Sequence, residues 1–282
     1  MLALVLSTVK AKLYPNATQA RALTAYLDQA RQVFNSCLAD RRDAWRESQT
    51  KRSRFDQTKM LTRGRAANEE LRRLPVQIGR DAIRRVDLAF QGFFRRVKAK
   101  TKRPGYPRFK GVNRYNSFTI GECGDVLKIQ GRVRVSGIDK PLRARGLRPF
   151  VGTIKRLCIV RRAGKWFARI LVDDGQAAPA KRPITTAIGI DMGLNSFLTT
   201  SEGQQVKCPK HYRRLEGTLR RAGRHVSRCK RGSGGRQRAV QRLQAVHAKI
   251  ADCRNDFTHK LSKSLVAGYS LIAAEKLNIG GM

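Results

Sequence analysis

Two acidic residues end short apolar segments in a chain that carries few acids. Asp191 follows the run ITTAIGI, and Glu275 follows the run SLIAA. Enzymes built on sheets present catalytic groups at the C-terminal ends of strands. A carboxylate that is buried there without a partner is costly, so an arginine or a divalent cation should neutralise it.

If these two segments are neighbouring strands, the two acids would form a site for Mg²⁺ or Mn²⁺. Mg²⁺ favours carboxylate oxygens. Metal-dependent phosphoryl transfer uses two ions about 3.5–4 Å apart to activate water and to stabilise the leaving oxygen. We therefore predict that Asp191 and Glu275 are metal ligands and catalytic residues. The alternative for Asp191 is a structural acid that is held by an arginine.

The charge of the chain points to a polyanionic partner. Lys and Arg number 60 against 20 Asp and Glu, which gives the 282 residues a net charge of +40. A chain that repels itself this strongly predicts binding to nucleic acid. Because 41% of the residues are hydrophobic, the chain can bury a core, which excludes a histone-like tail. No apolar run approaches about 18 residues, so no membrane partner is expected.

The cysteines give no sign of a metal or disulfide framework. Six are scattered along the chain, and no two form a CxxC pair. This spacing predicts no zinc site within this chain, and it is typical of a reducing compartment. We therefore expect a cytoplasmic protein.

The first hundred residues read as a strand followed by helices. Residues 2–13 predict a strand, and Asn16 and Gln19 have the spacing of a capping box at the start of a long helix. Further helices are expected near 56–73 and over 78–100, so 14–100 should be a helical unit with a basic exterior. Apolar residues at helical spacing predict the buried faces, among them Trp45 in the first helix and Phe90, Phe93, Phe94 and Val97 in the last.

The helical pattern of the sequence stops at the segment TKRPGYPRFKG, residues 101–111. Its prolines and glycines end the helix, and short alternating segments follow, including a hairpin turn at RRAGKW. Residues 101–174 predict an antiparallel β unit, a barrel that recruits the N-terminal strand, with a linker at 173–183. The basic and aromatic residues of 101–111 suit phosphate neutralisation with base or sugar stacking: Arg103, Tyr106, Arg108, Phe109 and Lys110. The alternative is an ordinary solvated turn with both aromatic rings in the core.

From residue 184 the pattern is two strands, helix and strand. NSFLTTS should pair back onto the strand that ends at Asp191. A basic segment over 207–238 includes Arg220, Arg221 and Arg224, which we expect to contact nucleic acid. A helix over about 236–268, with a buried stripe that includes Val240, Ile250 and Phe257, should lead into the last strand.

Five segments resemble, in order, the TnpB (OrfB-type) transposon-encoded proteins, which are related to the type V CRISPR effectors. They are YPNATQARALTAYLDQARQVFNSCLADRRDAW, RPGYPRFKGVNRYNSFTI, IGIDMGLNSFLTTSEG, CRNDFTHKLSKSLV and IAAEKLNIGGM. The resemblance implies a mixed α+β fold: a helical recognition lobe inserted in an oligonucleotide-binding-like β barrel, then a RuvC nuclease domain of RNase H-like fold. The implied domains are a barrel of 1–13 and 101–180, a recognition domain of 14–100 and a RuvC-like domain of 184–282.

The resemblance also implies a function. A guide RNA made from the transposon end pairs with target double-stranded DNA, and the RuvC site cuts the DNA. Asp191 would be the first RuvC acid and Glu275 the second, with Mg²⁺ or Mn²⁺ as cofactor. Arg254 and Lys260 would contact the nucleic-acid backbone. One monomer per guide RNA, in the nucleoid region of a prokaryotic cell, is the implied setting.

Two departures from the family pattern shape the expectation. An acid usually follows the second catalytic acid, and here the residue is Lys276. A family chain also continues with a CxxC-containing zinc segment and a helix that carries a third acid, and neither lies within residues 1–282. We therefore expect the RuvC-like domain to lack its C-terminal part, and this chain alone to bind DNA and RNA with weak or no cleavage. Two alternatives stay open: a nuclease-dead RNA-guided DNA-binding regulator, and a basic RNA-binding structural protein.

Overall fold

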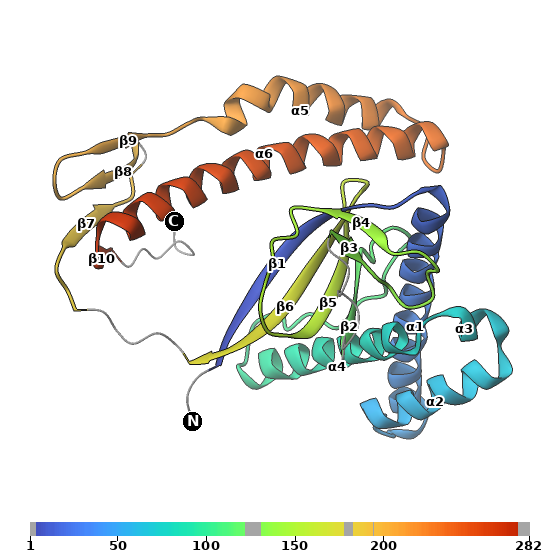
Figure 1. The fold of residues 1–282 in the computed structure, drawn as a ribbon. Helices are drawn as coiled ribbons and strands as arrows, with labels where there is room; N and C mark the ends of the chain where they lie inside the picture. The colour runs from blue at the N-terminus through green and yellow to red at the C-terminus, as the bar shows by residue number, and fades with distance from the viewer. Residues whose placement is uncertain (1–3, 122–130, 178–182, 194, 276–282) are drawn as a thin grey trace. The chain divides into compact units, whose positions relative to one another are not determined.

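The chain forms two compact units, residues 1–178 and 179–282 (Figure 1). The computed structural model describes the ranges 4–121, 131–177, 183–193 and 195–275. Within these ranges, none of the helices has the length and apolar character that a membrane crossing needs.

The described part of the first unit contains four helices after its first strand. They are α1 (Ala17–Ser48), α2 (Arg54–Ala67), α3 (Glu69–Arg73) and α4 (Val76–Lys98). The capping box at Asn16 is confirmed, because its side chain accepts the Gln19 amide at 2.8 Å and Gln19 accepts the Asn16 amide at 3.1 Å. The single helix expected near 56–73 is two helices, since the Asn68 side chain caps α3 and its extended backbone interrupts the run.

Six strands of the first unit form one antiparallel sheet. They are β1 (Leu4–Tyr14), β2 (Ser117–Gly121), β3 (Arg132–Val133), β4 (Leu142–Arg145), β5 (Thr153–Arg162) and β6 (Lys165–Ala177), in the order β2-β5-β6-β1-β4-β3. The N-terminal strand is recruited as predicted, between β6 and β4. Among the described strands the order ends at β2 and β3, so closure into a barrel stays a prediction.

The hairpin of β5 and β6 shows how local sequence sets this sheet. Its two turn residues, Ala163 and Gly164, have φ angles of 49° and 75°, the left-handed values that match the twist of a hairpin. The linker expected over 173–183 is wrong for 173–177, because β6 continues through Ala177 and pairs there with Leu4. Backbone pairing of Asp173 and Ala177 with the N-terminal strand keeps this segment in the sheet, with an irregularity between the two pairs. Part of the β unit predicted over 101–174, residues 122–130, lies outside the described ranges.

The core of the first unit lies where α1 and α4 pack against the sheet. Leu23, Ile83, Phe118, Ile159 and Ile170 are fully buried. The buried faces predicted for the helices are wrong at their ends, because Trp45, Phe94 and Val97 are 47%, 59% and 46% exposed. Among the described residues of this unit, the ends of these two helical faces are therefore left open to solvent.

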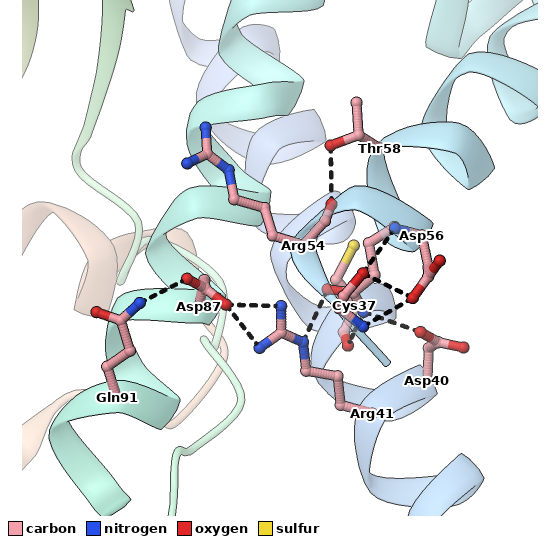
Figure 2. A network of polar contacts seen from close by, with 10 residues as sticks. Cys37, Asp40, Arg41, Arg54, Asp56, Thr58, Asp87 and Gln91 are labelled. Atoms are coloured by element: carbon pink, nitrogen blue, oxygen red, sulfur yellow. Dashed lines mark hydrogen bonds and ion pairs between the residues drawn. The ribbon is translucent and has the colours of Figure 1, made fainter. Parts of the chain in front are cut away.

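A buried arginine links three helices of the first unit (Figure 2). The Arg41 side chain, 9% exposed, donates to Asp87 of α4 from both terminal nitrogens at 3.1 Å. Its Nε donates to Gln57 of α2 at 3.0 Å, and Gln57 donates to the Cys37 carbonyl at 2.7 Å and to Asp40 at 2.9 Å. Arg41 is therefore not part of the basic exterior predicted for 14–100, because its side chain makes structural hydrogen bonds.

The second unit is a four-stranded sheet with two helices. Its elements are β7 (Ala187–Asp191), β8 (Ser196–Thr200), β9 (Gln205–Lys207), α5 (His211–Arg228), α6 (Gly234–Gly268) and β10 (Leu271–Ala274). The strand order is β10-β7-β8-β9; β10 runs parallel to β7, and the other pairs are antiparallel. The stripe predicted for α6 is buried only at Ile250, and its other members, such as Val240 and Phe257, are half-buried.

Candidate catalytic and nucleic-acid-binding sites

The structure brings the two predicted acids together. Ile190 of β7 is the partner of Ala274 in the parallel pair. Asp191 and Glu275 are the next residues on the two strands, so they are neighbours at the same end of the sheet. Adjacent strands lie about 4.8 Å apart, and side chains in register on parallel strands project from the same face. Both residues are exposed.

The register of these strands is fixed at their opposite end by Thr186 and Ser270. The Ser270 hydroxyl donates to the Thr186 carbonyl at 2.7 Å, and the Ser270 amide donates to the Thr186 hydroxyl at 3.0 Å. The amides of Thr185 and Thr186 donate to the Ser270 hydroxyl at 2.9 Å each. A one-residue slip would break these bonds and would turn the acids to opposite faces. Sequence reasoning missed this pair, although both residues lie within the predicted strand segments and directly precede the observed β7 and β10.

Two exposed carboxylates suit one kind of metal site. Mg²⁺ keeps several water ligands and is held by one or two carboxylates together with substrate phosphates, so Asp191 and Glu275 fit that donor set. Among the described residues, no group of three or more His, Cys, Asp or Glu side chains could hold a metal on its own. Glu202 accepts a hydrogen bond from the Tyr269 hydroxyl at 2.8 Å, near the beginning of β10.

Helix α5 presents predicted nucleic-acid-binding arginines to solvent. Arg220, Arg221 and Arg224 are exposed, and Arg220 forms an ion pair with Glu216 at 3.2 Å. The helix lies alongside α6 (Figure 1). Its half-buried apolar residues recur at helical spacing: Leu215, Leu219, Ala222 and Val226. The basic segment is therefore an amphipathic helix whose arginines stay available to phosphates.

The two basic residues predicted on α6 are also exposed. Arg254 and Lys260 lie on exposed positions of the helix, and Lys260 forms an ion pair with Asp256 at 2.7 Å. An exposed ion pair of this kind contributes little to the stability of the fold. A phosphate could therefore replace Asp256 as the partner of Lys260 at small cost.

The segment 101–111 is irregular in structure but firmly attached to two helices. Arg96 of α4 donates to the carbonyls of Pro104 and Gly105. Asn35 of α1 donates to the Lys110 carbonyl at 3.0 Å and accepts the Lys110 amide at 2.8 Å. Fixed at both ends in this way, the segment presents Arg103 and Arg108 to solvent.

Tyr106 and Phe109 lie between the two placements considered for them. They are 45% and 48% exposed, so they are neither in the core nor fully solvated. The Tyr106 ring packs edge-on against Phe90 at 5.6 Å and Phe93 at 5.4 Å between centroids. The guanidinium of Arg42 lies 5.2 Å from the centre of the Phe109 ring. Each ring therefore packs against protein on one side and is open to solvent on the other.

These features define a mixed α/β protein with a curved antiparallel sheet, paired acids on a second sheet and a strongly basic surface. Family comparison agrees with that class. A model described as "Probable transposase" matches residues 169–282, and one described as "Helix-turn-helix domain" matches residues 1–50. In the described part of the latter segment, the chain forms β1 and the single long helix α1.

Curated relatives extend the match over almost the whole chain. A "Putative RNA-guided DNA endonuclease" of Streptomyces pristinaespiralis is 32% identical over 96% of this chain and 66% of its own length. The "Putative RNA-guided DNA endonuclease InsQ" of Escherichia coli is 24% identical over 98% of this chain and 67% of its own length. This chain thus spans about two thirds of each relative. It belongs to the TnpB (OrfB-type) family of transposon-encoded proteins.

Solved structures give a looser likeness. The Cas12f1 chain of a complex with sgRNA and target DNA matches 93% of this chain and 66% of its own, at 12% identity and a TM-score of 0.49. A likeness at this level carries no argument about the site.

Proposed function

We propose that this chain takes part in RNA-guided DNA cleavage, in which a guide RNA selects a double-stranded DNA target. Hydrolysis of the phosphodiester would take place at Asp191 and Glu275 with Mg²⁺ or Mn²⁺. The observation that carries the proposal is the register of β7 and β10, which makes these two acids neighbours. The curated RNA-guided endonuclease relatives support the class of ligand and reaction.

The proposal assigns a role to each part of the chain. Residues 14–100 would be a recognition domain, 1–13 and 101–180 a β barrel, and 184–282 a RuvC-like domain. Three antiparallel strands beside a fourth that is parallel to the first support an RNase H-like arrangement for that last domain. The exposed arginines of α5 would neutralise phosphates along the bound nucleic acid.

The chemistry would follow from the position of the acids on the open end of the sheet. Asp191 and Glu275 would hold the cation, and the Thr186–Ser270 contacts would keep the two carboxylates on one face. When bound, a divalent cation polarises a phosphoryl oxygen and lowers the pKa of coordinated water. Arg254 and Lys260 would position the DNA backbone, because both carry exposed positive charge on the helix that leads into β10.

Mn²⁺ binding tests the acid pair independently of turnover. In titrations followed by electron paramagnetic resonance, with a short DNA strand present, we expect Mn²⁺ binding that is lost in both Asp191→Ala and Glu275→Ala. Glu202→Gln is the matched control, since this acid belongs to the same unit and is engaged with Tyr269. Binding that is unchanged in both alanine variants would refute the metal site.

Plasmid cleavage with guide RNA and Mg²⁺ tests the reaction. Cutting should depend on the guide and should be abolished by Asp191→Ala, while guide-dependent DNA binding is retained. If guide-dependent DNA binding survives Glu275→Ala, and neither the wild type nor this variant cuts the plasmid, the chain would be a nuclease-dead RNA-guided DNA-binding regulator. If the chain binds every RNA with a similar, modest affinity, whether or not the RNA carries a guide segment, the chain would be a basic RNA-binding structural protein.

A further inference from the structure

The first unit has a hollow at its surface that is lined by aromatic rings and arginines, here called the aromatic hollow. It measures about 290 Å³ and lies between α1 and the segment 101–111. Leu38, Arg42, Trp45, Arg46, Tyr106 and Phe109 line it. The volume is at the lower end of the range for small-molecule sites, roughly 300–1,000 Å³, which suits a single flat group.

Exposed aromatic rings in this region need an explanation. Trp45, Tyr106 and Phe109 are 47%, 45% and 48% exposed, and Phe94, which packs against Phe93, is 59% exposed. Trp45 and Phe94 belong to the apolar faces that helical spacing predicts to be buried. Contiguous exposed apolar surface usually marks a binding site, so this face is expected to receive a ligand.

The Tyr106 ring is held in place before any ligand arrives. Tyr106 is held by Phe90 and Phe93, and the segment that carries it is fixed by Arg96 and Asn35. Phe90 in turn lies 5.3 Å from the guanidinium carbon of the buried Arg41. Flat rings that are fixed in this way lose little conformational freedom on binding, which favours stacking of another flat ring.

The charge around the hollow selects the class of ligand. Arg42 and Arg46 line it, and Arg103 and Arg108 of the attached segment are exposed. Two acids of α1 adjoin these arginines in the sequence: Asp43, which is engaged by Arg42 at 2.7 Å, and Glu47, which is exposed, so the four arginines outnumber the acids. A ligand with a flat ring and a neighbouring negative charge is complementary to this surface. A nucleotide with an unpaired base has both features.

We propose that the aromatic hollow binds an unpaired nucleobase of a single-stranded stretch of nucleic acid. The base stacks on the open side of the Trp45 ring, with Tyr106 and Phe109 lining the rest of the hollow, and Arg46 contacts the adjoining phosphate. A paired base is excluded, because its faces are covered by its neighbours and unstacking it costs free energy. This inference rests on the proposed function only in that the ligand is nucleic acid.

Tryptophan emission reports on the hollow directly. The chain has two tryptophans, Trp45 at the hollow and Trp166, which is 6% exposed in β6. The probes are unstructured RNA and DNA strands of roughly 12 nucleotides, within the site sizes of single-strand binders, and a blunt duplex of the same sequence. Both single strands should quench the emission of the wild type, the duplex should not, and Trp45→Leu should remove the response. Comparison of the two strands distinguishes RNA from DNA as the source of the base.

Affinity and its salt dependence separate stacking from charge. A lost stacking contact is worth about 1–3 kcal/mol, so Trp45→Leu should weaken single-strand binding at least about fivefold with an unchanged salt slope. Arg46→Gln should instead lower that slope by about one. Val151→Ala, at a position 86% exposed in the same unit, is the control and should bind like the wild type.

Three results would overturn the inference. They are unchanged Trp45 emission with saturating single strand, equal responses to single strand and duplex, and a response to polyglutamate that matches the response to RNA. The last result would make the hollow a site for an acidic protein partner. Because Asp191→Ala lies in the other unit, it should leave the emission response intact. A negative result in the Mn²⁺ or plasmid experiments would therefore not contradict base binding at the aromatic hollow. A negative result in the emission experiment would likewise not contradict the proposed metal site.

Discussion

The buried Arg41 allows a sharp test of how the helical part of the first unit is held together. Its guanidinium reaches Asp87 on α4 (Figure 2) and Gln57 on α2. It also lies 5.3 Å from the centre of the Phe90 ring. The proposed change is Arg41→Ala. It removes a side chain of α1 that hydrogen-bonds to residues of both α2 and α4.

The size of the effect follows from which partners water can reach. Gln57 is 1% exposed, so its carbonyl oxygen would lose its partner in a dry site, at a cost of about 1–3 kcal/mol. The Asp87 side chain is 25% exposed, so water can replace part of its lost bonds. Adding the lost packing on Phe90, we expect Arg41→Ala to lower the free energy of unfolding by about 3–4 kcal/mol.

Urea denaturation followed by tryptophan fluorescence measures this change in the first unit alone, because both tryptophans lie in residues 1–178. The matched control is Arg73→Ala, which breaks an ion pair with Glu69 whose side chains are 74% and 76% exposed. Exposed pairs contribute at most about 1 kcal/mol. If Arg41→Ala cost no more than Arg73→Ala, the interpretation of this network as a structural link would be refuted.

Two further predictions concern single residues of the same unit. Asn16→Ala removes the capping box of α1 and should lower the unfolding free energy by about 1 kcal/mol in the same urea assay, whereas Asn16→Asp should not. Burial raises the pKa of Tyr115 to about 12, so the folded state keeps a proton that the unfolded chain loses near its ordinary value of about 10. Stability should therefore fall between about pH 10 and pH 12, and Tyr115→Phe should remove about 3 kcal/mol of this loss at the upper end. Because the Tyr115 hydroxyl has no hydrogen-bond partner among the described residues, the same variant should cost little at neutral pH, and a large loss there would contradict this account.

Local signals in the sequence were sufficient for several elements. The Asn16–Gln19 spacing located the start of α1, and the RRAGKW segment located the turn between β5 and β6. Each depends on neighbouring residues, whose geometry is set by the backbone alone. The same local reasoning failed at 173–177, where polar residues are held in β6 by pairing with the distant first strand.

The spacing of apolar residues predicted which face of each helix is apolar. It could not predict whether another element covers that face. Trp45 and Phe94 follow the apolar spacing of their helices, yet both are exposed near the ends of α1 and α4. Arg41 breaks that spacing, yet its side chain is 9% exposed because Asp87 and Gln57 come from helices that no local pattern places beside it. Exposed apolar residues such as Trp45 mark a candidate binding surface, whereas an arginine with little exposure, such as Arg41, marks a structural link between helices.

The neighbouring positions of Asp191 and Glu275 depend on a connection that the sequence does not reveal locally. Parallel strands need a crossover between them, and here the chain returns to β10 through α5 and α6. The exposed arginines of α5 and the exposed Arg254 and Lys260 of α6 all lie in that crossover. The segment that brings the second acid beside the first therefore also carries the predicted phosphate contacts. A change that shortens or unfolds the helical pair should weaken nucleic-acid binding and separate the acids at once, so these two proposed roles are linked by the topology of the sheet.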